Sequence, residues 1–443
     1  MDTKGITRTV SVAILVVVIA VSAIIGGMYW LSRPTQTEEL PPIKIGVITT
    51  LTGGFAYAGE TQRAGIQYVA DLWNEQGGVN GRKIEIVTGD DTGDPAVAML
   101  RARQLVEQGC VALAGGVLAN IMNAVFEYTR KANIPYLVGN AACPTFNRGS
   151  TITKYLLNYE VSADHLNQVL IKYLFSIGAP KKVISIGPDY AWGQLHQLSI
   201  KEATKDYGGE FALGVLAPYP CPDLTPYIDA IMQIPTPWTI VVNQFADEAL
   251  VVLTQLQQRG VKDKGCIVAL QALDDSVFIQ GTIGEDIAEG IYNVVHWTYT
   301  LDDPKTHQIA LDYYNKFGMF PACHTWPTMD QMNRVFKSMN TTKTTDINVW
   351  ITEFMKPQSV MYSETVQCQY REDYMRLGGN CIILKGKAPS EKINRFPEIS
   401  GWATKLDYFK LVYTPTIAEL DSIITLEEAQ SGIAYGDSRV GPD

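Results

Sequence analysis

The hydrophobic pattern of the chain alternates short apolar runs with longer segments of helical periodicity. From residue 43 onward each apolar run, beginning with IKIGVITT (43–50), is followed by a segment whose apolar residues recur at helical spacing. A first set of such pairs ends with IPYLVG (134–139), and a second set occupies residues 163–273. Strands that alternate with helices predict parallel sheets flanked by helices, so the two sets predict two doubly wound α/β lobes.

The chain after residue 297 has a different pattern. It predicts helices at 304–317 and 328–339, and strands and turns in a Tyr-rich stretch at 362–413. The length of 443 residues also favours two domains, because single cores stop growing at roughly 250–300 residues.

The N-terminus carries a long apolar segment. VSVAILVVVIAVSAIIGGMYWL (10–31) contains no charged residue, and a helix of this length spans roughly 33 Å, enough for the hydrocarbon core of a bilayer. Lys4 and Arg8 precede it, so the positive-inside rule leaves the short N-terminus in the cytoplasm and the body outside. We therefore predict one N-terminal transmembrane helix, with a cleaved secretory signal as the alternative.

The same segment resembles a known class of processed N-termini. KGITRTVSVAILVVVIA (4–20) resembles the archaeal pilin-type signal peptides, which are cut after a Lys-Gly pair. The resemblance implies cleavage after Gly5, with the apolar helix kept on the mature protein. The expected location is therefore the extracytoplasmic face of the cell membrane, or a secreted or surface-assembled form after processing.

Charge and cysteine content narrow the class of protein. The net charge is −10, and residues 1–33 contribute +2, so the rest of the chain carries −12. An acidic body does not favour nucleic acid or anionic lipid surfaces as partners. Seven cysteines in an exported chain permit disulfides, and Cys368 and Cys381 flank a turn signal, so we predict a disulfide between them.

Catalytic and metal-binding motifs are missing from the sequence. It has no H-E-x-x-H, G-x-S-x-G, G-x-x-x-x-G-K-[ST] or C-x-x-C pattern, and its five histidines are dispersed. We therefore predict no enzyme activity, no cofactor and no metal.

The loop TGGFAYAGE (52–60) leaves the first predicted strand at the edge where open parallel sheets bind ligands. Gly53, Gly54 and Gly59 allow close backbone approach, whereas Phe55 and Tyr57 supply rigid apolar surface. No P-loop lysine follows, so the loop suits an organic ligand better than a phosphate.

This loop and the segments around it resemble a known family. Residues 52–59 (T-G-G to Gly59), 74–81 (N-E-Q-G-G-V-N-G) and 90–95 (D-D-T-G-D-P) are similar to the opening motifs of type I periplasmic solute-binding proteins, the branched-chain amino-acid-binding family of ABC importers. IPYLVGNAACP (134–144), GPDYAWGQ (187–194) and DIAEGIYNV (286–294) continue the resemblance.

The resemblance implies a specific architecture and function. Two α/β lobes joined by a three-segment hinge would close on a small organic solute, an amino acid, amide or related compound, and present it to the ABC permease. The expected division is an N-terminal anchor or signal at 1–31, a linker at 32–42, lobe 1 at 43–157 plus 297–355, lobe 2 at 158–296 plus 356–413, and a C-terminal tail at 414–443. A surface scaffold or an extracytoplasmic ligand sensor built on the same fold is the alternative.

The family places its solute against one wall of each lobe. In lobe 1 the family's two hydroxyl positions fall near Asn120 or Ile121 and at Ala142, so both hydroxyls are lost here. The residues expected on this wall are Phe55, Tyr57, Ala58, Asn120, Asn140, Ala141 and Ala142.

In lobe 2 the family's aromatic and acidic positions map to Trp192, Phe245 and Asp274 (or Asp275). The sequence leaves several alternatives open. Trp192 and Phe245 could belong to the lobe core, and Tyr57 could lie on the surface. Asp90 and Asp91 could cap the next helix, and Asp274 and Asp275 could cap a short helix.

Overall fold

The structure is a computed structural model that describes residues 16–24, 28, 40–139, 146–159, 162–244, 246–271, 287–379, 381–400 and 406–431. It divides into two compact units, Met1–Pro41 and Pro42–Asp443.

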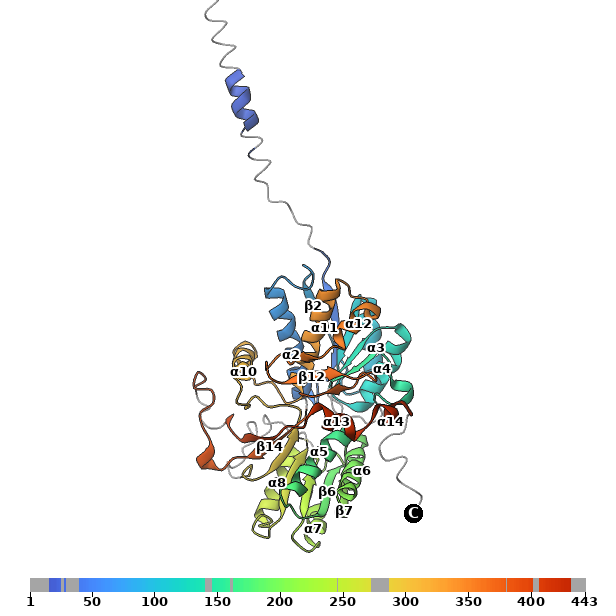
Figure 1. Cartoon of the computed structure of the whole chain (residues 1–443), viewed down its shortest axis with the longest axis vertical. Helices are drawn as coiled ribbons and strands as arrows, with labels where there is room; N and C mark the ends of the chain where they lie inside the picture. The colour runs from blue at the N-terminus through green and yellow to red at the C-terminus, as the bar shows by residue number, and fades with distance from the viewer. Residues whose placement is uncertain are drawn as a thin grey trace, which may run out of the picture. The chain divides into compact units, whose positions relative to one another are not determined.

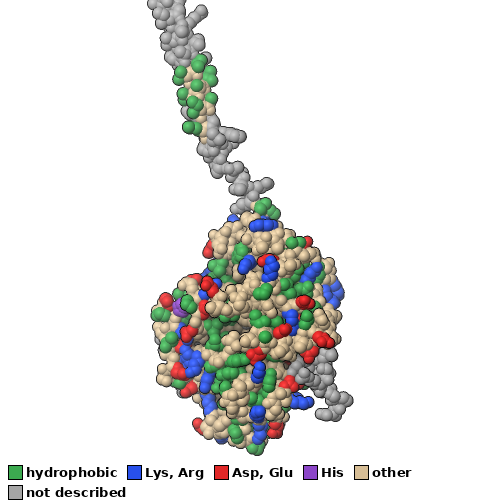
Figure 2. Space-filling model, in the orientation of Figure 1, with side chains coloured by type: hydrophobic (Ala, Val, Ile, Leu, Met, Phe, Trp, Pro, Cys, Tyr) green, Lys and Arg blue, Asp and Glu red, His purple; other side chains and the backbone are tan. Residues whose placement is uncertain are grey.

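The first unit contains the described part of the predicted apolar span. Residues 16–24 are helical, and the side chains of Val17 and Ile19 are each 60% exposed. Figure 2 shows hydrophobic side chains around this short helix. Among the residues that the structure describes, no helix combines the length and the apolar character needed to cross a membrane. The rest of the predicted span, and the Lys-Gly site, lie outside the described residues.

In the second unit, the first five strands form a parallel sheet in the order β2-β1-β3-β4-β5. The strands are β1 (Ile43–Thr49), β2 (Ile84–Asp90), β3 (Cys110–Gly115), β4 (Tyr136–Val138) and β5 (Leu156–Asn158). Because successive side chains along β1 point to opposite faces of the sheet, Ile45 and Val47 lie in one hydrophobic core and Ile48 lies in another. The sheet is therefore buried on both faces, as the continuous apolar runs predict.

Helices from two parts of the chain cover the faces of this sheet. The helices of this lobe are α2 (Ala56–Glu75), α3 (Pro95–Glu107), α4 (Ala119–Ala132), the 3₁₀ turn η1 (Gly149–Thr151), α10 (Pro304–Phe317), α11 (Thr325–Thr342) and α12 (Ile347–Phe354). α2 and α11 pack together on one face, and α3 and α4 cover the other. Asp94 caps α3 by accepting hydrogen bonds from the Ala96 and Val97 amides, and Pro95 occupies the first position of this helix.

Lobe 2 contains a seven-stranded sheet in the order β15-β14-β10-β9-β8-β6-β7. Its strands are β6 (Lys182–Pro188), β7 (Glu210–Ala217), β8 (Thr239–Val242), β9 (Ile267–Gln271), β10 (Tyr292–Val295), β14 (Ile382–Gly386) and β15 (Phe409–Tyr413). The first five run parallel, whereas β14 is antiparallel to β10 and to β15. The helices α7 (Thr225–Met232) and α8 (Ala246–Gln258) cover one face, and α5 (Ala163–Ser176) and α6 (Ala191–Asp206) cover the other.

The stretch that follows α12 serves both lobes. It forms a small antiparallel sheet of β11 (Gln358–Ser359), β12 (Gln367–Tyr370) and β13 (Arg376–Leu377), then β14, the 3₁₀ turn η2 (Pro389–Glu391) and β15. Tyr362 and Cys368 pack in the core of lobe 1 with Trp326, whereas Leu377 packs in lobe 2. The chain therefore passes between the lobes within this small sheet, later than the predicted boundary at residue 356.

The predicted tail is folded up to residue 431. α13 (Ile417–Ile423) contacts α5 and β13 in lobe 2, and α14 (Leu426–Ser431) contacts η1 in lobe 1. Figure 1 shows both helices where the two lobes meet. Leu420 and Ala429 are fully buried, so this stretch, which we call the C-terminal strap (residues 417–431), is held by apolar contacts rather than left in solvent.

Candidate functional site

The carboxyl end of β1 is packed tightly against α2. A Cβ atom at Gly59 would lie 1.8 Å from the Thr50 carbonyl oxygen, so only glycine fits at this position of the first turns of α2. Gly53 has a φ of +80°, which turns the chain out of the strand exit. Of the glycines predicted to allow close backbone approach, Gly59 does so. A Cβ atom at Gly54 would have no other atom within 4 Å.

Gly59 carries a testable consequence. Gly59→Ala forces the first turns of α2 away from the β1 exit, and we expect it to lower the free energy of unfolding by about 1–3 kcal/mol. Gly54→Ala is the matched control in the same loop, since nothing lies within 4 Å of the added methyl group. Urea unfolding of both variants measures the difference, and equal stabilities would contradict the tight contact at Gly59.

Asp90 and Asp91 hold the loop after β1 in place. Asp90 accepts hydrogen bonds from the Leu51 and Thr92 amides, both at 2.9 Å, and Asp91 accepts one from the Thr50 hydroxyl at 2.7 Å. Burial alone would raise the pKa of Asp90, but these hydrogen bonds outweigh it and lower that pKa. For Asp91, burial dominates and raises the pKa. The pair braces the loop, and Asp94, not Asp90 or Asp91, caps α3.

The Gln62 side chain of α2 forms hydrogen bonds with residues at the carboxyl ends of β1 and β3. Its amide oxygen accepts from the Thr49 hydroxyl at 3.1 Å, and its amide nitrogen donates to the Gly116 carbonyl at 3.3 Å. A Cβ atom at Gly139 would lie 2.2 Å from that nitrogen. Sequence reasoning missed Gln62, because a glutamine inside a helix carries no motif.

The predicted lobe 1 residues lie around this braced edge. Phe55 and Tyr57 are half-buried, and Ala58 is buried, with its carbonyl oxygen 3.5 Å from Nε2 of His324. Asn120 is exposed in the first turn of α4, next to the β3 exit. Asn140, Ala141 and Ala142 lie outside the described residues.

Phe55 makes a contact that joins the two lobes. Its ring lies 5.8 Å from that of Tyr219, in the loop after β7, and Tyr219 lies 5.9 Å from Tyr190 at the β6 exit. The carboxyl ends of the two parallel sheets are therefore brought together at these three aromatic rings. Of these three rings, the sequence predicts only that of Phe55 as a site residue.

In lobe 2, Trp192 is half-buried and fixes the exit of β8. Its indole nitrogen donates to the Asn243 carbonyl at 3.2 Å, and its ring lies 4.1 Å from His196. Phe245 and Asp274 lie outside the described residues. Glu248, in the first turn of α8, is the acidic group that the structure describes near this edge; it accepts from the Cys221 amide at 2.6 Å, and burial raises its pKa.

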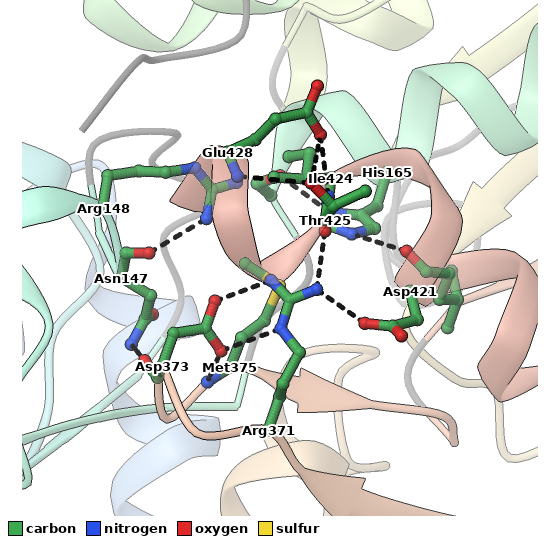
Figure 3. Close-up of polar contacts among 12 residues, drawn as sticks. Asn147, Arg148, His165, Arg371, Asp373, Met375, Asp421, Ile424, Thr425 and Glu428 are labelled. Carbon is green, nitrogen blue, oxygen red and sulfur yellow. Dashed lines mark hydrogen bonds and ion pairs between the residues drawn. The ribbon is translucent and has the colours of Figure 1, made fainter. Parts of the chain in front are cut away.

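Figure 3 shows an ion-pair network that joins Arg371 and Asp373, which lie between β12 and β13, to the strap. Arg371 bonds Asp373 through two nitrogen atoms, at 2.6 and 3.1 Å, and donates to Asp421 and to the Ile424 carbonyl at 2.6 Å each. Arg148 donates to the Asn147 carbonyl at 3.0 Å. The network ties the turn between β12 and β13 to the strap.

The predicted disulfide is not present in the structure. Cys368 and Cys381 are both free and buried, Cys368 in the lobe 1 core and Cys381 in the lobe 2 core. Sγ of Cys368 lies 2.8 Å from a guanidinium nitrogen of Arg334 instead. The residues between the two cysteines do turn the chain. Cys368 before the turn packs in lobe 1 and Cys381 after it packs in lobe 2, so the turn does not form a hairpin that would bring the two thiols together. Among the described residues no group of His, Cys, Asp and Glu is placed to hold a metal ion.

Burial also predicts how these thiols react. It raises the pKa values of Cys368 and Cys381, so neither thiol becomes a reactive thiolate in the native protein. We expect iodoacetamide to modify both only after denaturation without reductant, as read by peptide mass spectrometry. A peptide pair joined through Cys368 and Cys381 would contradict the structure.

Comparison with known proteins agrees with this architecture. Residues 42–345 match the periplasmic binding protein family. A Leu/Ile/Val-binding protein homolog of Brucella melitensis is 26% identical over 310 residues, which cover 68% of this chain and 76% of that protein.

Two solved structures share the fold at low sequence identity. A branched-chain amino-acid ABC transporter periplasmic ligand-binding protein from Burkholderia xenovorans has a TM-score of 0.75 and 17% identity, covering 88% of this chain and 98% of its own. A solute-binding protein of an ABC transporter from Rhodopseudomonas palustris, in complex with 3,4-dihydroxybenzoic acid, has a TM-score of 0.69 and 20% identity, covering 84% and 96%. All three relatives are bacterial, so they do not support the predicted archaeal character.

These proteins bind solutes and are not enzymes, as the sequence predicted. With a family match over residues 42–345 and two wound sheets that meet at their carboxyl ends, the chain belongs to the periplasmic binding protein family.

Proposed function

We propose that this chain is the extracytoplasmic solute-binding component of an ABC importer, which captures a small organic solute by closure of its two lobes. The observation that carries the proposal is the Phe55–Tyr219 contact, because it joins the ligand-binding edges of two separate parallel sheets. Hinged closure of this kind buries a solute between the lobes and creates a surface that a permease recognises.

The solute site is proposed to combine residues of both lobes. Phe55, Tyr57, Ala58 and Asn120 are the described candidates from lobe 1, and Trp192 is the described candidate from lobe 2. Asn140, Ala141, Ala142, Phe245 and Asp274 complete the proposed set outside the described residues. The aromatic groups favour a solute with an apolar body.

The names of similar proteins cover more than one solute. The Brucella relative is named for leucine, isoleucine and valine, and the Rhodopseudomonas protein holds an aromatic acid. We propose an amino acid, amide or related compound for this chain. The lost hydroxyl positions near Asn120 and at Ala142 are the reason that a standard branched-chain amino acid is not singled out.

The N-terminal unit is proposed to tether the protein to the membrane. The uncharged stretch 10–31 follows two basic residues, and its described part is helical with exposed apolar side chains. The permease subunits are the proposed partner of the body. Membrane fractionation of cells that express the full chain tests the tether, and release of all the protein by salt or high pH would overturn it.

A thermal-shift screen tests the binding function. We expect one class among amino acids, amides, polyamines and aromatic acids to stabilise the full chain, by about 2.7 kcal/mol at a concentration 100 times the dissociation constant. Small-angle scattering should show a smaller radius of gyration with that solute. Phe55→Ala with Tyr219→Ala should weaken binding, because the cross-lobe contact of the closed state is lost.

Leu198→Ala, at an exposed position of α6, is the matched control and should bind normally. A scaffold that only uses the binding fold would show neither stabilisation nor contraction with any solute of the panel. A sensor would bind and contract but would not support uptake when expressed with the permease subunits. Either result would replace the importer role.

A further inference from the structure

Within the described residues, three buried side-chain amides at the carboxyl edge of lobe 2 have no hydrogen-bond partner. Asn243 follows β8 directly, Gln244 comes next, and Gln271 ends β9; each side chain is at most 2% exposed. The nitrogen and the oxygen of each amide are buried and without a partner in the described structure. Buried polar groups are nearly always paired in folded proteins, so these unpaired amides require an explanation.

The strand register places two of these amides side by side. Val242 pairs with Leu270 in the parallel β8–β9 ladder, so Asn243 and Gln271 occupy the next level on neighbouring strands. Val241 and Ala269 face the core under α5 and α6, and strand alternation puts Asn243 and Gln271 on that same face. Gly187 lies on β6, the other neighbour of β8. A Cβ atom at this position would lie 2.7 Å from the amide atoms of Asn243, so the Asn243 side chain fits there because residue 187 is glycine.

The corresponding edge of lobe 1 shows that burial does not by itself leave an amide unpaired. Gln62 is as fully buried as the lobe 2 amides, yet its oxygen and its nitrogen both have partners, Thr49 and Gly116. The two edges bind ligands in folds of this type, and they meet at Phe55 and Tyr219. The lobe 1 amide is paired within the protein, whereas the donors and acceptors of the lobe 2 amides are left available to a ligand.

We propose that Asn243 and Gln271 bind the polar end of the solute, and that this end is an uncharged group with a donor beside an acceptor, such as a primary carboxamide or a urea. This inference rests on the proposed binding function. A carboxylate only accepts and would leave both amide oxygens unpaired, whereas an ammonium only donates and would leave both amide nitrogens unpaired. The two N–H groups of a primary carboxamide can donate to the two amide oxygens while its carbonyl oxygen accepts from the two amide nitrogens. A net charge buried there would also need a countercharge, which neutral amides do not supply.

A matched set of probes tests this chemistry on the full chain. Butyramide, butyrate, butylamine and valine are compared by thermal shift and calorimetry, with urea as a fifth probe. We expect butyramide or urea to bind at least tenfold more tightly than the charged probes, and Gln271→Met to weaken that binding by at least tenfold. Butyrate, butylamine or valine binding as tightly as the amides would overturn the inference while leaving the solute-binding function intact.

The stability of the ligand-free protein gives an independent readout. Because the Gln271 amide has no partner, Gln271→Met should keep the melting temperature within about 2 °C of the parent or raise it. Gln62→Met should lower it by several degrees, and Gln257→Met, at an exposed position of α8, should change little. A large fall with Gln271→Met would show that the amide serves the fold and would overturn the inference, whatever the probes do. If no solute of any class binds, the proposed function fails, and the Gln271→Met result still decides the role of the amide.

Discussion

Arg371→Leu is expected to lower the free energy of unfolding by about 3–5 kcal/mol, because it leaves the buried carboxylate of Asp373 without a countercharge. The Asp373 side chain is 0% exposed, and two nitrogen atoms of Arg371 bond it. The same guanidinium holds Asp421 and the Ile424 carbonyl of the C-terminal strap. The loss should therefore be accompanied by faster hydrogen exchange across residues 417–431.

Two companion variants separate the causes. Arg130→Leu removes an exposed i,i+3 ion pair with Glu127 on α4, and such pairs contribute about 0–1 kcal/mol. Arg371→Leu combined with Asp373→Asn removes the stranded charge and should recover part of the lost stability. Urea unfolding measures all three proteins. If Arg371→Leu costs no more than Arg130→Leu, the buried network does not hold the strap.

The strap could have been predicted from its helix-start signals. TIAE (416–419) and TLEE (425–428) both have the S/T-x-x-E pattern of a capping box. In the structure the Glu419 amide donates to the Thr416 hydroxyl at 3.1 Å, and Thr425 and Glu428 cap each other. Each helix is shorter than three turns, so hydrophobic periodicity was too weak to detect it. The prediction of a C-terminal tail therefore followed the short length and weak hydrophobic periodicity of these two segments rather than their capping motifs.

The parts of the fold set by local chemistry were the predictable ones. The parallel strands follow from continuous apolar runs, and the start of α3 follows from Asp94 and Pro95. The pairing of Cys368 could not be predicted in this way, because its environment is made by Arg334 of α11, distant in sequence. The roles of the lobe 2 amides and Tyr219 could not be predicted from the sequence either, because their position at the edge depends on strand order and on how the two lobes meet.

Lowering the pH from 7 to 5 is the second change with a large expected effect, because three histidines are buried in the neutral form. Burial is the main cause that lowers the pKa of His165 and His196 to about 3 and of His324 to about 4. His165 lies within hydrogen-bond distance of Ser162 and the Leu420 carbonyl, and His196 lies 3.3 Å from the Asn167 amide nitrogen. Asp164 acts in the opposite direction, because burial raises its pKa to about 7.

The sign follows from which state binds protons. A histidine with a lowered folded pKa contributes its full stability above pH 6.5 and loses about 1.4 kcal/mol per unit as the pH falls toward the folded pKa. At pH 5 this is about 2 kcal/mol for each of the three histidines, or about 6 in total, whereas Asp164 returns about 2–3 because the folded state holds its proton below pH 7. We expect a net loss of about 3 kcal/mol between pH 7 and pH 5. His196→Gln should flatten this dependence, Asp164→Asn should steepen it, and the surface variant His307→Gln is the control. Urea unfolding at half-unit steps measures the slopes, and a stability that is constant or rises toward pH 5 would contradict the neutral burial of these side chains.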